Sequence, residues 1–159
     1  MNIRLIYATN SGGSQEAGKI ISDVLTSAGH VVTLKRANEA SAEDLATPDV
    51  VILGSCTWER LDEKKQLLEG QLQEHMFAFA QSLAGKTFPQ QRFAVYGLGD
   101  SSYTIFCGAA DRLEELVASV QGQQVGPTLR VDGFFFHLDE NQQKVRAWAE
   151  GLGKALKKA

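Results

Sequence analysis

A short polar loop near the N-terminus has the composition of an oxyanion site. It follows a predicted strand, leads into a predicted helix, and consists of Thr9, Asn10, Ser11, Gly12, Gly13 and Ser14. Glycines let backbone N–H groups converge on a phosphate, and the dipole at a helix N-terminus favours the negative charge. The hydroxyls add further donors. The loop therefore predicts an anion site, with an ordinary Ser/Gly-rich turn that caps a helix as the alternative.

The residues around this loop narrow the kind of phosphate that it could hold. No lysine precedes Ser14, so the loop lacks the Lys-Ser/Thr pair that reaches nucleotide β- and γ-phosphates. Lys35 and Arg36 stand where a dinucleotide-binding fold needs an acid. We therefore expect the loop to bind one terminal phosphate without a cation.

Two aromatic side chains follow other predicted strands and suit a flat ligand. Trp58 comes after Ser55, Cys56 and Thr57, and Tyr103 closes a loop that contains Leu98, Gly99 and Asp100. A tryptophan at the end of a central strand is better placed to cover a ligand than to fill the core, because its ring is large and its N–H needs a partner. Packing of Trp58 on the following helix is the alternative. Together with the phosphate loop, the two rings predict a site for a planar, phosphorylated ligand.

The elements that must position these loops alternate along the chain. Apolar, β-branched runs predict strands at residues 3–8, 31–34, 50–54, 93–97 and 125–131, the last interrupted by Gly126-Pro127. Helical patterns lie between them, including a long one from about 62 to 83 and others at 106–120 and 141–156. This order is typical of an α/β fold, a three-layer doubly wound sheet of five parallel strands. Ligands bind such sheets beyond the carboxyl ends of the strands, where all three loops lie.

Composition limits the class of protein and its partners. The 159 residues suit one domain, 1–159, and the net charge of −3 leaves no positive excess for nucleic acid. No apolar run approaches the roughly 18 residues of a membrane span, and the N-terminus has no signal-peptide pattern, so we expect a cytoplasmic protein. We expect Cys56 and Cys107 to be free thiols. The three histidines share no metal-ligand spacing, and we assign no catalytic residue or metal site.

At these loops the chain resembles the flavodoxins, and specifically the short-chain ones, over its whole length. Residues 9–14 are similar to the family's Thr/Ser-x-Thr-Gly-x-Thr phosphate loop, and Gly54 to Trp58 to the loop whose Trp covers the inner flavin face. Gly97 to Tyr103, followed by Phe106 and Cys107, resembles the loop whose Tyr stacks on the outer face and whose backbone binds the pyrimidine edge. The resemblance implies a flavodoxin-like strand order of 2-1-3-4-5 and FMN as the cofactor, bound by these loops with Glu59 included.

The same resemblance implies a low-potential one-electron carrier rather than an enzyme. Such a carrier shuttles electrons between a reductase donor and an acceptor protein through the semiquinone and hydroquinone states of its flavin. Stacking in a region that carries Glu59, Asp62, Glu63 and Asp100 should disfavour added negative charge on the ring. We expect a monomer. The alternative is a flavodoxin-like FMN-dependent quinone or azo reductase, against which Tyr103 argues because it would cover the face that a nicotinamide needs.

Two departures from the family pattern stand out. Glu59 replaces the glycine that usually follows the Trp and whose peptide flips to stabilise the semiquinone. A left-handed backbone costs a non-glycine residue on the order of 1 kcal/mol, so we expect a less stabilised semiquinone. Phe134, Phe135 and Phe136 follow the fifth strand on the ligand side of the sheet. Because neighbouring strand residues point to opposite faces, they predict either an apolar docking patch or a loop folded over the end of the core.

Overall fold

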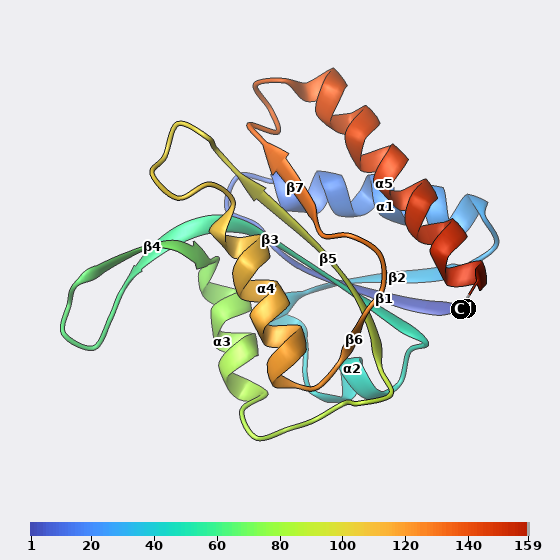
Figure 1. The fold of residues 1–159 in the computed structure, drawn as a ribbon, viewed down its shortest axis with the longest axis horizontal. Coiled ribbons are helices and arrows are strands. Elements are labelled where there is room, and N and C mark those ends of the chain that lie inside the picture. Colours follow the sequence, from blue (N-terminus) through green and yellow to red (C-terminus); the bar gives the residue numbers. More distant parts are fainter. Residues whose placement is uncertain (159) are drawn as a thin grey trace.

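The computed structural model describes residues 1–158, in which strands and helices alternate (Figure 1). The strands are β1 (Asn2–Ala8), β2 (Val31–Arg36), β3 (Val50–Leu61), β4 (Leu67–Leu72), β5 (Arg92–Gly99), β6 (Gln123–Gln124) and β7 (Leu129–Asp132). The helices are α1 (Gly13–Ser27), α2 (Glu43–Ala46), α3 (Glu74–Ser82), α4 (Gly108–Ser119) and α5 (Leu138–Lys158), with a short 3₁₀ turn η1 (Ala37–Glu39). Within residues 1–158, no helix is both long enough and apolar enough to span a membrane.

The central sheet confirms the predicted strand order. Its parallel strands run β2-β1-β3-β5, and β6 and β7 both pair with the outer edge of β5. These two short strands together fill the fifth position. The predicted strand 125–131 is a strand only from Leu129 onward, since β6 ends at Gln124. Gly126 adopts a φ of +71°, and Pro127 has no N–H to donate to a ladder, which separates β6 from β7.

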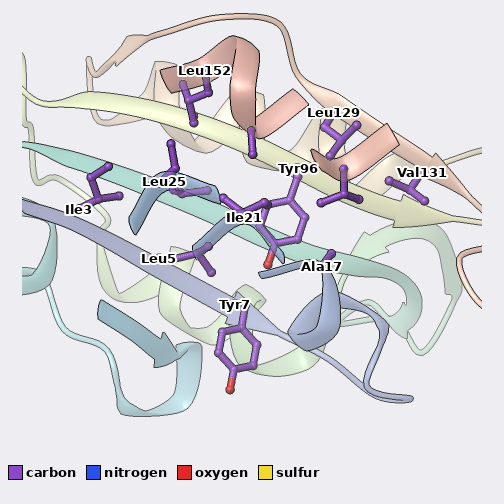
Figure 2. Packing of buried hydrophobic residues seen from close by; sticks show 14 of the residues in the cluster. Ile3, Leu5, Tyr7, Ala17, Ile21, Leu25, Tyr96, Leu129, Val131 and Leu152 are labelled. Atoms are coloured by element: carbon purple, nitrogen blue, oxygen red, sulfur yellow. The ribbon is translucent and has the colours of Figure 1, made fainter. Parts of the chain in front are cut away.

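Helices cover both faces of the sheet and make the three layers that the sequence predicts. On one face, α1 and α5 pack on β1, β3 and β5, with Ile21, Leu25 and Leu152 buried between them (Figure 2). On the other face, α3 and α4 bury Met76, Phe79 and Leu113 against the same strands. The predicted all-apolar run at residues 50–53 is fully buried in β3, because both faces of that central strand are covered.

The structure corrects the predicted long helix at 62–83. β3 continues to Leu61, the chain turns, and β4 returns antiparallel beside it, so that only α3 is helical in this stretch. The Asp62 carboxylate accepts hydrogen bonds from the N–H groups of Lys64 and Gln66, both at 2.8 Å, and Lys65 adopts a φ of +60°. These local bonds form a turn in place of the first turn of the predicted helix.

The strands β3 and β4 form a hairpin, the β3–β4 hairpin, in which the leucines of the predicted helix pair across the strands. Leu68 lies opposite Arg60 in the ladder, and Leu61 lies opposite Leu67. The pairing slips between Trp58 and Arg60, where Glu59 faces two residues of β4 instead of one. The leucines are thus spaced as on one face of a helix, but their cross-strand pairing forms a hairpin instead.

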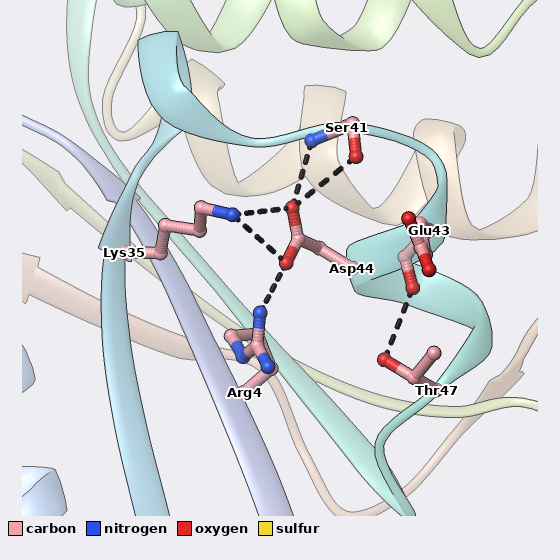
Figure 3. A network of polar contacts seen from close by, with 6 residues as sticks. All are labelled: Arg4, Lys35, Ser41, Glu43, Asp44 and Thr47. Atoms are coloured by element: carbon pink, nitrogen blue, oxygen red, sulfur yellow. Dashed lines mark hydrogen bonds and ion pairs between the residues drawn. The ribbon is translucent and has the colours of Figure 1, made fainter.

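A cluster of charges ties the connection after β2 to the sheet. The buried Asp44 carboxylate accepts hydrogen bonds from Arg4, from Lys35 at 3.0 Å and from the Ser41 N–H at 2.9 Å (Figure 3). Burial by itself raises the pKa of Asp44, but the Ser41 N–H, Lys35 and Arg4 outweigh it and hold that pKa below its ordinary value.

Candidate functional site

The three predicted segments meet in one cleft at the carboxyl edge of the parallel strands. The segment from Cys56 to Glu59, expected to follow a strand at 50–54, lies within β3, because that strand continues to Leu61. The cleft encloses about 470 Å³. It is lined by Thr9, Asn10, Ser11, Gly13, Ser14, Cys56, Thr57, Trp58, Glu59, Glu69, Gly70, Leu98, Gly99, Asp100, Tyr103, Ile105, Gly133, Phe134, Phe135 and Phe136. A cleft of this size at this edge of a doubly wound sheet is where such folds bind their ligands.

One end of the cleft is a set of hydrogen-bond donors around the start of α1. Gly12 adopts a φ of +91°, and its N–H donates to Thr9 Oγ1 at 2.9 Å, which closes the loop. The Ser14 hydroxyl is fully buried at the cleft and has no hydrogen-bond partner among residues 1–158. The first N–H groups of a helix also have no partner within the helix. A buried, unpaired hydroxyl beside these groups fits an anion that supplies several acceptor oxygens.

Among residues 1–158, no lysine, arginine or histidine lines the cleft at this end. The geometry therefore agrees with a phosphate held by neutral donors and by the positive end of the α1 dipole.

The second loop is joined to the first by a residue that the sequence did not reveal. Gln73, almost fully buried, donates from its side-chain amide to Asn10 Oδ1 at 3.2 Å, and its backbone N–H donates to Ser55 Oγ at 3.1 Å. Its side-chain oxygen also accepts from the His75 N–H and caps α3. Gln73 thus holds the loop after β1 against the middle of β3. The sequence did not reveal Gln73 because this residue lies within the helix predicted at 62–83.

The other end of the cleft presents the two aromatic rings. Trp58 is 52% exposed and Tyr103 is 72% exposed, and both line the cleft. The alternative in which Trp58 packs on a helix that follows it directly is wrong, because β4 and not a helix follows β3. Two large rings left open to water, one on β3 and one on the loop after β5, would be shielded by a flat ligand between them.

The third loop is held in shape by short polar contacts. Asp100 Oδ1 accepts from the Ser102 N–H at 2.8 Å, and the Asp132 carboxylate accepts from the Ser101 N–H at 2.9 Å. The bonds from Ser101 lower the pKa of Asp132. The Gly133 N–H donates to the Gly99 carbonyl at 2.9 Å, which joins the end of β7 to this loop.

Carboxylates gather at the ring end. Glu59, Glu69 and Asp100 line the cleft there. Arg60 does not neutralise them from within the cleft, because its guanidinium lies over the Phe77 ring of α3 at 4.0 Å from the ring centre. Asp62 and Glu63, which we expected nearby, lie at the turn of the β3–β4 hairpin and do not line the cleft.

All the predicted site residues line the cleft except Gly12, Phe106 and Cys107. Gly12 forms the turn itself, and Cys107 is buried behind Gly99, where a Cβ would lie 2.6 Å from the Cys107 backbone nitrogen. Burial raises the pKa of the Cys107 thiol to about 11 and also raises the pKa of Cys56. These thiols are therefore poor nucleophiles.

Several lining residues were not among the predicted ligands. Glu69 and Gly70 come from β4, and Ile105 and Gly133 from neighbouring loops. The predicted aromatic run divides: Phe134 is buried, whereas Phe135 is 51% and Phe136 81% exposed at the mouth of the cleft. The Asn141 amide donates to the carbonyls of Asp132 and Gly133, at 3.0 and 3.1 Å, and so holds the run in this position.

The comparisons with known proteins agree with this geometry. The family model described as flavodoxin matches residues 5–148. The chain is 32% identical to the flavodoxin of Nitratidesulfovibrio vulgaris, over 98% of this chain and 99% of that protein. It superposes on the crystal structure of oxidised flavodoxin 2 from Bacillus cereus with a TM-score of 0.81 and 25% identity, covering 97% of this chain and 99% of that one. The structure of the Fusobacterium nucleatum flavodoxin bound to flavin mononucleotide superposes with a TM-score of 0.76 and 15% identity, covering 96% and 97%. On the family match and the extent of this identity, the chain belongs to the flavodoxin family.

Proposed function

We propose that the cleft binds one FMN, with the phosphate in the loop Thr9–Ser14 and the flavin ring between Trp58 and Tyr103. As a flavodoxin, the protein is an FMN-binding electron carrier and not an enzyme. The observation that carries the assignment of residues is the buried Ser14 hydroxyl, which lacks a partner among residues 1–158, at the start of α1. Its position beside free helix N–H groups matches a phosphate monoester better than a neutral ligand.

The residues at the ring end suit transfer of single electrons. When bound, FMN supplies a ring that accepts and releases electrons one at a time. Trp58 and Tyr103 shield the faces of that ring from water. Glu59, Glu69 and Asp100 disfavour additional negative charge in the cleft, and no cation from the lining offsets them within residues 1–158. Their charges therefore lower the potential at which the fully reduced state forms.

The reductase alternative is not favoured. A reductase needs one open flavin face for a nicotinamide and then for its substrate. In the proposed arrangement, Trp58 occupies one face and Tyr103 the other, so only the edge of the ring is left for electron transfer. The proposal includes a reductase as donor, a second redox protein as acceptor, a monomeric state, a cytoplasmic location and a single FMN-binding domain over residues 1–159.

The test is a titration of the purified apoprotein with FMN, followed by exposure of the complex to NADH and NADPH. We expect quenching of the flavin fluorescence at one FMN per chain and no bleaching of the yellow colour by either nicotinamide alone. Absence of binding would reject the assignment of the cleft. Rapid bleaching by NADPH without another protein would replace the carrier function with a reductase.

A further inference from the structure

The β3–β4 hairpin, which carries Trp58, touches the segment that carries Tyr103. Ile105, two residues after Tyr103, packs over Gly70 of β4, so that a Cβ on Gly70 would lie 2.5 Å from Ile105 Cγ2. Gly108 is the first residue of α4, and a Cβ there would lie 2.6 Å from the Cα of Gly70 and even closer to its carbonyl oxygen. The backbone of β4 and the first turn of α4 are therefore in direct contact, with no room for a side chain.

A second link joins the same two parts of the fold. The Thr57 hydroxyl donates to the Leu98 carbonyl at 2.8 Å and accepts from the Ala109 N–H at 3.2 Å. Thr57 directly precedes Trp58, and Ala109 directly follows Gly108. Both strands of the hairpin are thus attached to the start of α4, one by a hydroxyl and the other by the pair of glycines.

These contacts join the two segments that carry the rings of the cleft. On one side, the chain runs from Tyr103 through Ile105 to Gly108. On the other side, Gly70 is followed by Gln71, which pairs with Trp58 across the hairpin. Protein interiors are close-packed, so an added methyl group at such a contact must move one backbone away from the other. Trp58 and Tyr103 are carried by the two segments that such a movement would separate.

We propose that Gly70 and Gly108 are positioning residues whose backbone contact sets the gap between Trp58 and Tyr103 and so determines how closely the two rings stack on the flavin. The inference rests on the proposed function, since it takes the ring end of the cleft as the flavin site. It adds that the β3–β4 hairpin acts as a spacer, meaning that its contact with α4 sets the distance between the two rings.

The experiment compares the FMN affinity of four glycine-to-alanine variants in the full chain. Gly108→Ala and Gly70→Ala introduce a methyl group into the contact. Gly151→Ala is the matched control in a helix, and Gly85→Ala is the control at a positive φ, because a Cβ at either position meets nothing within 4 Å. We expect the dissociation constant of FMN to rise about tenfold for the first two variants, the scale of a lost aromatic stack, and to stay unchanged for the controls. Urea unfolding of each apoprotein measures how much of the change is loss of folding.

Two further variants separate a spacer from general damage. In a Tyr103→Ala background the outer ring is already absent, so we expect Gly108→Ala to weaken FMN binding by less than about twofold. A second full tenfold loss would overturn the inference. The double variant Gly70→Ala/Ile105→Ala removes the side chain that the new methyl group would meet. Its affinity for FMN should therefore return towards that of Ile105→Ala alone. This double variant tests the inference if Gly108→Ala does not fold.

The outcomes also distinguish this inference from the proposed function. If the unaltered protein does not bind FMN, the assignment of the cleft fails. If the unaltered protein binds FMN and both contact variants bind it equally well, only the spacer is rejected.

Discussion

The two ends of the cleft are built in opposite ways. The end that we propose for the phosphate, here called the phosphate end, is one run of consecutive residues, Thr9 to Ser14, closed by a hydrogen bond within the loop and continued by α1. The ring end is assembled from Trp58 on β3, Tyr103 after β5 and the glycine contact between β4 and α4. On the proposed assignment, anchoring of the ligand depends on local geometry, whereas the environment of the reactive ring depends on long-range packing.

The two ends also differ in charge. The phosphate end offers hydroxyls and N–H groups without a charged side chain, and the ring end carries Glu59, Glu69 and Asp100. The phosphate end accepts the fixed negative charge of a phosphate, whereas the carboxylates of the ring end oppose an additional negative charge on the ring. We infer that the phosphate end supplies most of the affinity for FMN and the ring end sets the potentials.

Removing the phosphate from the ligand tests the first half of this comparison and has the largest expected effect. We expect riboflavin to bind at least about 100-fold more weakly than FMN, because each lost charge-assisted hydrogen bond is worth roughly 1.5–3 kcal/mol. Fluorescence titration of the apoprotein measures both constants. Ser14→Ala should weaken FMN but leave riboflavin binding unchanged. Equal affinities for the two flavins would show that the loop holds no phosphate.

Removal of either ring tests the second half. Trp58→Ala and Tyr103→Ala should each weaken binding about tenfold, and by the same factor for riboflavin as for FMN, because the rings do not touch the phosphate. Trp148→Phe, on α5, is the matched control, since its side chain donates to the Pro127 carbonyl away from the cleft. A loss confined to FMN would contradict the division of the cleft into two ends.

The charge at Glu59 should affect potential rather than affinity. In the structure, Glu59 belongs to β3 and is not among the residues with positive φ. We expect Glu59→Gln to raise the potential of the second electron by tens of millivolts, with about 59 mV corresponding to ~1.4 kcal/mol. Glu59→Gly should in addition widen the gap between the two one-electron potentials, because glycine tolerates a rearranged peptide. Redox titration measures both, with Glu63→Gln at the hairpin turn as the control. If the gap between the two one-electron potentials is unchanged in Glu59→Gly, the backbone at residue 59 has no role in stabilising the one-electron-reduced state.

The Asp44 cluster should affect folding and neither end of the cleft. Asp44→Asn is expected to lower the free energy of unfolding by about 1–3 kcal/mol at pH 7, with FMN affinity unchanged. Because the pKa of Asp44 lies below its ordinary value of 3.8, its stabilisation is present above that value and is lost as the pH falls through the lower, folded pKa. Urea unfolding should therefore show the difference from the unaltered protein shrinking below about pH 4. A difference that persists in acid would mean that the carboxylate charge is not its source.

The contrast between the two ends also explains what the sequence could predict. The place of the loop Thr9–Ser14 in the cleft was predictable because its residues are contiguous and a helix N-terminus has the same donors in any fold. The layers followed from the alternation of buried runs with amphipathic helices, and the strand order followed from the resemblance to the flavodoxins. Glu69 and Gly70 were missed because leucines spaced for a helix face lie in a hairpin, where the turn at Asp62 and the pairing of Arg60 with Leu68 prevail. Gln73 was missed with them, since its partners Asn10 and Ser55 are remote in sequence.

Anaerobic stepwise reduction of the FMN-loaded protein, followed by visible absorbance, tests the central claim most directly. We predict that the yellow spectrum passes through a distinct one-electron-reduced spectrum before it bleaches, with two separate potentials. The lower potential should rise when Glu59 or Glu69 is replaced by glutamine. Bleaching in a single two-electron step, with no intermediate spectrum, would contradict the assignment of this protein as a carrier of single electrons.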